Sequence, residues 1–296
     1  MNNSQFEWLK QGRGLHPKLS WSFATDAPLR HFQLARESGD LLAADESGGL
    51  HRLDRRGQVV ALSRGYQNLR ALAWSDSGNV GVAAIGESRL CLFDRTLEVE
   101  WITKFPDEIL AVAIEPFGNF IAVALANGHN LIYTVRKKRL REFVTVRPLS
   151  HLQFLATERT LIGAAEYGLV CCHQLNGTHL WSEKVMSNIG DISATGDGGR
   201  IFVAGFTIGV PVFDKHGESV GSYLVEGSPN RLASSYRMYR FAVSTVEGHL
   251  YWLDNEGNIV WACEVPEDVA QLQCSAQGNG FVCGFHSGRI IRLDWG

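Results

Sequence analysis

The chain has 296 residues, of which 45% are hydrophobic and 20% charged, so it has enough apolar material for a large globular core. Its formal net charge of −3 argues against a general nucleic-acid or membrane surface, because such surfaces need clustered positive charge. No apolar run approaches the roughly 20 residues that a membrane span needs, so we expect a globular protein without one.

The start of the chain, MNNSQFEWLK, has no basic leader followed by an apolar run, so we expect no export signal. The six cysteines show no spacing typical of a secreted disulfide framework. We therefore expect them to be reduced and mostly buried, as in a cytoplasmic protein.

Residues 1–16 form an N-terminal extension that lies outside the repeat of the rest of the chain. In the stretch SQFEWLK, Ser4 is suited to cap a short helix with Glu7 at its third position. One interpretation is that this helix folds back over the end of the protein and buries Trp8. The other is a docking peptide, in which Phe6 and Trp8 contact another subunit. The sequence leaves both open.

From residue 32 onward, columns of similar residues recur every forty residues without a gap. The first column is mostly Asp and consists of Asp54, Asp94, Thr134, Gln174, Asp214, Asp254 and Asp294. A small-residue column consists of Ala44, Ala84, Ala124, Ala164, Ala204, Ser244 and Gly284. An apolar column consists of Phe32, Leu72, Val112, Leu152, Ile192, Leu232 and Leu272. Such a repeat predicts seven copies of one structural unit.

Each copy has the pattern of four short strands separated by turn residues. In the second copy the strands are LRALAW, NVGVAA, RLCLFD and VEWITK. Four strands in a period of about 40 residues are typical of a β-propeller blade. We expect the small column where the inner strands crowd together, and the apolar column between neighbouring blades.

The last copy stops at IIRLDWG, one strand short of a complete blade. The repeat makes residue 17 equivalent to the position after Gly296, and residues 17–25 read PKLSWSFAT, an alternating strand. We therefore predict an all-β, single seven-bladed propeller over 17–296, closed by this N-terminal strand, which removes the open sheet edge. The predicted blades are 28–67, 68–108, 109–148, 149–188, 189–228, 229–268, and 269–296 completed by 17–27.

The phrase LDNEGNIVW (253–261) resembles the quinoprotein (PQQ-type) propeller repeat, in which Leu-Asp, a turn Gly and a Trp recur; LDRRGQVVA (53–61) and FDKHGESVG (213–221) are weaker copies. In broad shape the chain also resembles WD40-type propellers, although it lacks Trp-Asp dipeptides at the strand ends. The resemblance covers nearly the whole chain. It implies the fold rather than a function, because propellers host enzymes, ligand binders and scaffolds alike.

The adjacent Cys171 and Cys172 resemble the vicinal pair of quinone-dependent dehydrogenases. That group typically has eight blades and a calcium site, whereas this chain has seven repeats and no recognisable cluster of metal-binding Asp, Asn and Glu. Neighbouring residues of a strand point to opposite faces, so we expect packing cysteines. We expect no cofactor and no metal, and we expect the neighbouring His173 to be a packed core histidine.

The one basic run, RKKRLR (136–141), lies between the third and fourth strands of blade three. It is either a solvated hairpin tip or a contact for an acidic partner. The other blades have no matching run, so binding of nucleic acid is not expected. No phosphate loop, Gly-x-Ser-x-Gly or His-Glu-x-x-His motif is present either.

The best candidate site lies where the first strands of the blades begin, at one end of the central channel. The residues there vary in polarity and charge, as in a site carried by a scaffold, but unconstrained loop positions vary in the same way. The candidates are Arg30, His31, Arg70, His151, Asp191, Arg231 and Gln271. Three arginines and two histidines predict a mildly basic mouth, suited to an acidic side chain or another carboxylate.

A regular ring without a catalytic motif favours a non-enzymatic protein–protein interaction module. We expect a scaffold or subunit of a larger cytoplasmic assembly, whose partners are other proteins. A stable interface needs only about 800 Å² per partner, which the end of a propeller offers. The alternative is a small-ligand-binding or enzymatic propeller, quinoprotein-like or lactonase-like, that uses the channel mouth.

Overall fold

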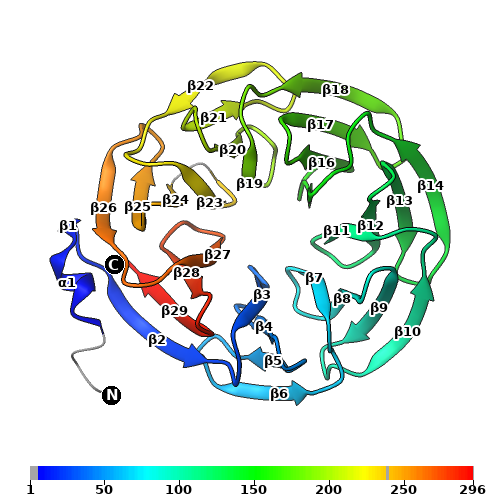
Figure 1. Cartoon of the computed structure of the whole chain (residues 1–296), viewed down its shortest axis with the longest axis horizontal. Coiled ribbons are helices and arrows are strands. Elements are labelled where there is room, and N and C mark those ends of the chain that lie inside the picture. The colour runs from blue at the N-terminus through cyan, green and yellow to red at the C-terminus, as the bar shows by residue number, and fades with distance from the viewer. Residues whose placement is uncertain (1–5, 238–239, 296) are drawn as a thin grey trace.

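The computed structural model describes residues 6–237 and 240–295. This part of the chain forms seven sheets in a ring around a central channel (Figure 1). In each blade the chain runs outward, from a first strand beside the channel to a fourth strand at the rim, and neighbouring strands are antiparallel. The predicted all-β, seven-bladed propeller is confirmed.

The first four blades follow one another along the chain. Blade one consists of β3 (Leu29–Leu34), β4 (Leu41–Asp45), β5 (Leu50–Leu53) and β6 (Val59–Ser63). Blade two consists of β7 (Leu69–Trp74), β8 (Val80–Ile85), β9 (Arg89–Asp94) and β10 (Val99–Lys104). Blade three consists of β11 (Ile109–Ile114), β12 (Phe120–Leu125), β13 (His129–Thr134) and β14 (Arg139–Val144). Blade four consists of β15 (His151–Phe154), β16 (Thr160–Ala165), β17 (Leu169–Gln174) and β18 (His179–Lys184).

The last three blades include both ends of the described chain. Blade five consists of β19 (Ile189–Ala194), β20 (Ile201–Gly205), β21 (Val210–Phe213) and β22 (Ser219–Tyr223). Blade six consists of β23 (Pro229–Ser234), β24 (Arg240–Thr245), β25 (His249–Asp254) and β26 (Ile259–Glu264). Blade seven consists of β27 (Val269–Cys274), β28 (Gly280–Phe285), β29 (Arg289–Asp294) and the N-terminal β2 (Lys18–Ala24).

The ring closes as predicted, because β2 is the outer strand of the last blade. It pairs with β29 from Lys18 opposite Asp294 to Ala24 opposite Arg289. The indole Nε1 of Trp295 also donates a hydrogen bond to the carbonyl of Leu15 at 2.6 Å. The two ends of the described chain are therefore joined by both backbone and side-chain contacts.

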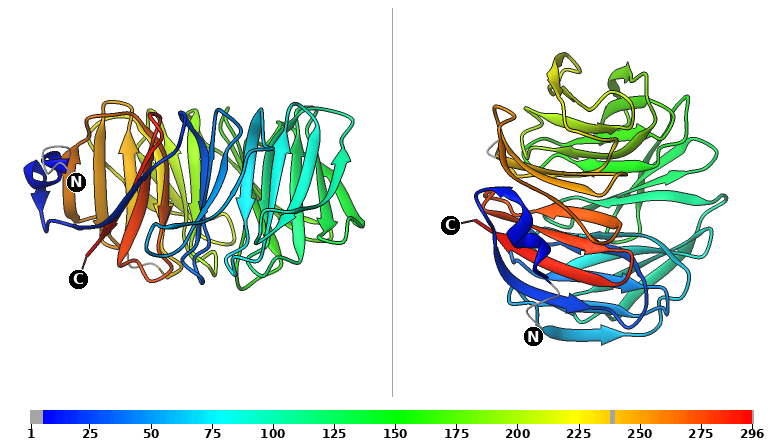
Figure 2. Two further views of the ribbon diagram at one scale, coloured as in Figure 1. Left: turned by 90° about the horizontal axis from the view of Figure 1, so that it is seen from below. Right: turned by 60° about the vertical axis from the view of Figure 1, so that its left-hand side comes forward.

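The segment before β2 lies on the rim of the ring, beside blades six and seven (Figure 2). It contains α1 (Trp8–Gln11) and β1 (Arg13–Gly14), and β1 pairs with β26 as a fifth strand of blade six, which the sequence analysis did not foresee. The predicted Ser4 cap lies outside the described residues. Glu7 directly precedes the helix, and no side chain caps it. No described α-helix approaches the length of a membrane span.

The small-residue column is explained by the close approach of neighbouring blades. At Gly284 in blade seven, a Cβ would come within 2.7 Å of the ring of Phe32 in blade one. Ala44 and Ala84 occupy the same position in blades one and two and are fully buried. Phe32 belongs to the apolar column, so the two columns meet across the contact between blades, as the sequence analysis expected.

The Asp column has a role in the hairpin between the third and fourth strands. In blade six, one carboxylate oxygen of Asp254 accepts hydrogen bonds from the backbone N–H groups of Glu256 and Asn258, both at 2.9 Å. Asp54, Asp94 and Asp214 make the same pair of bonds. Such bonds stabilise a tight turn. The column therefore marks this turn in blades one, two, five and six and, at Asp294, the point where the last hairpin is divided between the two chain ends.

Candidate functional site

The seven predicted mouth residues come together at one end of the channel. We call this side of the ring, where the first strand of each blade begins, the mouth face, and the opposite side the back face. A cavity of about 370 Å³ opens on the mouth face and is lined by Arg30, His31, Arg70, His151, Asp191, Arg231 and Gln271. The predicted Phe6 and Trp8 lie elsewhere: they pack on the rim against blades six and seven.

A second layer of polar residues lines the same cavity, and the sequence analysis missed it. Gln33, Gln153, Ser193 and Gln273 lie two positions after the predicted residues on their strands. Residues two apart on a strand share a face, so the alternation of the first strands was the signal that could have identified them.

Several mouth side chains bond to the neighbouring first strand and so connect blades. Asp191 of blade five accepts a hydrogen bond from the backbone N–H of Leu232 in blade six at 3.2 Å. His31 of blade one lies 2.7 Å, through Nε2, from the carbonyl oxygen of Arg70 in blade two. These side chains thus hold the inner strands in register around the channel.

Arg231 has the most extensive set of these contacts. Its Nε donates to the carbonyl of Ala270 in blade seven at 2.7 Å, and its Nη1 donates to the carbonyl of Gly190 in blade five at 3.0 Å. Next to it, the Oε1 of Gln271 accepts from the backbone N–H of Phe32 in blade one at 3.1 Å. Arg231 and Gln271, two of the predicted partner-binding residues, therefore already make contacts that hold neighbouring blades together.

The other two arginines of the mouth are paired with carboxylates. Arg30 lies 3.3 Å from Glu46, and Arg70 forms an ion pair with Glu108. Together with Asp191 near Arg231, these acids offset the positive charge that the sequence analysis expected. The mouth is less basic than its arginines alone indicated, because Glu46 and Glu108 come from loops outside the repeat column.

The titratable groups of the mouth are perturbed mainly by burial. Burial, followed by the charge of Arg231, lowers the pKa of His151 to about 4. Burial also lowers the pKa of His31, while it raises the pKa of Asp191 to about 6. Because burial disfavours the charged form, both histidines are neutral at pH 7 and Asp191 is mostly ionised. Nδ1 of His151 lies 3.8 Å from Asp191.

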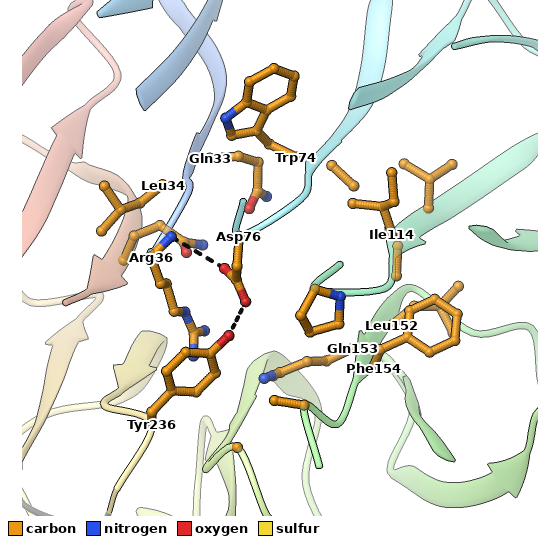
Figure 3. A pocket seen from close by; sticks show the side chains of 17 residues that line it. Gln33, Leu34, Arg36, Trp74, Asp76, Ile114, Leu152, Gln153, Phe154 and Tyr236 are labelled. Carbon is orange, nitrogen blue, oxygen red and sulfur yellow. Dashed lines mark hydrogen bonds between the residues drawn. The ribbon is translucent and has the colours of Figure 1, made fainter. Parts of the chain in front are cut away.

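Three side chains bridge the channel near the back face (Figure 3). Tyr236, from the first turn of blade six, donates its hydroxyl proton to the carboxylate of Asp76 in blade two, on the other side of the channel. The backbone N–H of Arg36 donates to the same carboxylate at 3.3 Å, and the Arg36 guanidinium lies 5.1 Å from the centre of the Tyr236 ring. Burial, followed by the charge of Asp76, raises the pKa of Tyr236.

The three bridging residues line a cavity of about 110 Å³. The sequence analysis did not identify the bridge, although Arg36, Asp76 and Tyr236 occupy one column, five positions after His31. The signal that could have indicated the bridge was that this column is polar in only some of the blades.

The cysteines are buried and free, as predicted. Cys171 packs in a cluster between blades three and four, and Cys172 in a cluster between blades four and five, so they point to opposite faces of the strand. Burial raises the pKa of each thiol to about 12. His173 stacks on Phe143 with ring centres 4.1 Å apart, and burial lowers its pKa to about 4, which agrees with a packed core histidine. Protonated, buried thiols are poor nucleophiles.

One group of side chains in the described residues has the composition of a metal site. Ligand atoms of Asp26, Asp45 and His51 lie within 4.8 Å of one another. Their contacts are already made: Asp45 accepts from Ser47, Gly49 and His51, and Asp26 pairs with Arg64 at 2.8 Å. Although burial disfavours its charge, these hydrogen bonds lower the pKa of Asp45. These hydrogen bonds and the ion pair account for the position of the three side chains without a bound ion.

The basic run of blade three contacts the chain itself. Lys137, in a left-handed turn conformation (φ 65°), donates its ammonium group to the carbonyl of Ile102 at 2.7 Å and lies 5.7 Å from the centre of the Trp101 ring. Arg139 pairs with Glu142 at 3.1 Å. Part of the run thus fastens the hairpin tip to blade two, which favours the structural interpretation.

The mouth face also exposes large apolar side chains, which no repeat column revealed. We call them the apolar arc: they lie on the loops and strand ends of blades three to six and are 55–92% exposed. The arc consists of Val144, Val146, Tyr167, Met186, Leu224 and Val246. Outside the mouth face, Phe117 of a back-face loop and Leu15, whose carbonyl bonds to Trp295, are similarly exposed, at 60% and 58%. A run of exposed apolar groups on one face is typical of an interaction surface.

No family model matches the chain, and no curated protein matches it. Solved structures do: the β-propeller domain of Cps50 (Swd1) from Myceliophteria thermophila superposes with a TM-score of 0.80 at 16% sequence identity. The match covers 95% of this chain and all of that domain. At this identity the similarity establishes the β-propeller fold alone. Since 1795 chains of solved structures match significantly, the fold by itself does not select a function.

Proposed function

We propose that this protein is a non-enzymatic protein-interaction module, a scaffold or subunit of a larger cytoplasmic assembly, which binds its partner through the mouth face. The apolar arc is the observation that carries the proposal. Exposed apolar groups gain free energy when a partner removes them from water, at roughly 25 cal/mol per Å² of apolar surface. A rigid ring is a suitable scaffold, because little conformational entropy is lost when it binds.

The chemistry of the described residues supports a binding role rather than a catalytic one. The thiols are buried with raised pKa values, and the mouth histidines are held neutral by burial. Asp191, Arg231 and Gln271 are engaged in contacts between blades. A nucleophile hydrogen-bonded to a base, the arrangement typical of covalent catalysis, is not formed by these groups.

The proposal is tested by affinity purification of the tagged full-length protein from its native lysate, followed by size-exclusion chromatography and mass spectrometry. We expect a partner protein in near-equal amount that stays bound through the column, and fractionation should place the complex in the cytoplasm. Recovery of the propeller alone, at its own mass of 32.8 kDa, would contradict the proposal.

The small-ligand alternative keeps one specific observation in its favour. The mouth cavity of about 370 Å³ is within the usual size of small-molecule sites and has a polar lining of histidine and glutamine side chains. Native mass spectrometry of the gently purified protein distinguishes the two functions. A bound small molecule that is lost in a Gln33→Ala/Gln273→Ala variant would support the alternative.

A further inference from the structure

The acidic side chains of the mouth face fall into two groups that differ in their partners. Near blades seven, one and two, four of them are paired with arginines, whereas Glu87 and Asp268 are exposed and take part in no ion pair among the described residues. The pairs are Asp26–Arg64, Glu46–Arg30, Glu108–Arg70 and Glu267–Arg289. Over blades four to six, Glu166, Glu226 and Glu247 have no cationic partner within the described residues, and each is exposed.

The unpaired acids alternate with the apolar arc. Glu166 precedes Tyr167 in the β16–β17 turn, and Glu247 follows Val246 in the β24–β25 turn. Leu224 and Glu226 lie two residues apart in the loop between blades five and six. Every one of these loops therefore presents an apolar group beside a negative charge.

Two of these loops form one continuous part of the surface. The carboxylate of Glu247 accepts hydrogen bonds from the backbone N–H of Ser228 at 2.6 Å and from its hydroxyl at 2.9 Å. The backbone N–H of Val246 donates to the Ser228 carbonyl at 2.9 Å. The hydrogen bond from the Ser228 backbone lowers the pKa of Glu247, so this acid stays ionised. Leu224, Glu226, Val246 and Glu247 are thus held together on a fixed backbone.

The cations on this side do not neutralise the acids. Arg147 donates its guanidinium to the carbonyl of Tyr167, and Lys184, at the end of β18, is exposed and takes part in no ion pair among the described residues. Arg13 lines a pocket together with Glu226 but forms no ion pair with it. A surface that combines apolar groups with unpaired carboxylates selects by charge: it attracts a cationic partner and repels an acidic one.

We propose that the mouth face over blades four to six docks a protein segment that presents apolar side chains together with lysines or arginines. The apolar side chains of the segment cover the arc, and its cations approach Glu166, Glu226 and Glu247. This inference rests on the proposed function and names the chemistry of the partner. It differs from the acidic partner that the arginines of the mouth alone predicted.

The test uses two synthetic helical peptides of about 18 residues, five helical turns, one made of leucine and lysine and the other of leucine and glutamate. Binding to the full-length protein is measured by fluorescence anisotropy at low and high salt. We expect the lysine peptide to bind, more weakly at high salt, and the glutamate peptide not to bind. Equal binding of both peptides, or no binding of the lysine peptide, would overturn the proposal.

Matched variants locate the binding. Glu226→Gln/Glu247→Gln should weaken the lysine peptide about tenfold, the effect of two exposed ion pairs, and Leu224→Ser/Val246→Ser should weaken it by about tenfold or more. Phe117→Ser and Glu218→Gln, on the back face, should change it less than about twofold. Unchanged binding of the lysine peptide to both mouth-face double variants would overturn the assignment of the site.

Two further results separate this inference from the proposed function. If affinity purification recovers a partner equally well with the wild type and with both mouth-face double variants, the inference fails and the interaction function stands. If no partner is recovered at all, the function itself fails. Sedimentation of the full chain as a dimer that Leu224→Ser/Val246→Ser dissociates would assign the surface to a second copy and overturn the proposed partner.

Discussion

The two faces of the ring use their acidic side chains differently. On the back face, Asp54 and Asp254 hold hairpin turns, and Asp76 accepts a hydrogen bond from Tyr236 across the channel. On the mouth face over blades four to six, Glu166 and Glu226 have no such role among the described residues. The comparison indicates that these back-face acids help to maintain the ring, while Glu166 and Glu226 on the mouth face are free for a partner. Substitutions of the back-face acids should therefore cost stability, and those of Glu166 and Glu226 should cost binding.

The largest effect is expected where the divided hairpin of the back face closes the ring. Deleting residues 1–27 removes β2, leaves the edge of β29 unpaired and uncovers Trp261 and Trp295. We expect a loss of more than about 5 kcal/mol in the free energy of unfolding, which approaches the whole stability of an ordinary domain. Circular dichroism during heating measures the effect.

A synthetic peptide of residues 17–27 provides the control for this deletion. Added to the truncated chain, it should restore part of the cooperative transition, because it supplies the missing strand. A truncated chain that melts like the full-length protein would show that β2 does not close the ring.

Trp295 gives the next largest effect. Its ring stacks on Trp252 and Phe281, at centre distances of 5.3 and 5.5 Å, and its indole N–H bonds to Leu15. Trp295→Ala should lower the free energy of unfolding by about 3–5 kcal/mol, measured by urea denaturation. Trp295→Phe keeps much of the packing and should cost about 1 kcal/mol for the lost hydrogen bond. Equal costs for the two substitutions would contradict this division between packing and hydrogen bonding.

The features that the sequence predicted are those that recur in every blade. The contact of a small residue with an apolar residue of the next blade occurs around the whole ring, so Gly284 and Phe32 belong to visible columns. The mouth residues were identified for the same reason: the repeat fixes their position whatever the side chain is. The closing strand followed because the repeat makes residue 17 equivalent to the position after Gly296.

The features that the sequence did not predict occur once. The bond from Tyr236 to Asp76 joins two members of one column on opposite sides of the channel, and the column does not indicate which of its members meet. The acids that pair with Arg30 and Arg70 come from loops, where the pattern constrains nothing. The apolar arc is a property of several loops together and becomes visible only when the ring brings them to one face.

Tyr236→Phe tests whether the bridge of the back face stabilises the ring. The substitution removes the hydroxyl that donates to Asp76, so this partly enclosed carboxylate loses one hydrogen bond. A hydrogen bond to a charged group contributes about 1.5–3 kcal/mol, so urea denaturation should show a loss in this range. Tyr167→Phe, on the mouth face, is the matched control and should change stability by less than about 0.5 kcal/mol. Equal effects of the two substitutions would remove the distinction between the faces.

The smallest effect is expected at the mouth, where Asp191 and His151 titrate in opposition. The pKa of Asp191 is raised to about 6, so the native state takes up its proton first and stability rises as the pH falls from about 6 to 4. The pKa of His151 is lowered to about 4, so the unfolded state takes up that proton first and stability falls over the same range. In the wild type the two contributions nearly cancel.

Single substitutions should expose the two opposing slopes. In Asp191→Asn, the free energy of unfolding should fall relative to the wild type by up to about 1 kcal/mol per unit as the pH is lowered from about 6 to 4, because only the histidine contribution remains. In His151→Gln it should rise relative to the wild type over the same range, because only the Asp191 contribution remains. Urea denaturation of the three proteins at a series of pH values measures both slopes. Parallel pH profiles of the three proteins would mean that burial does not perturb the pKa values of Asp191 and His151, and that solvent reaches both side chains at the mouth.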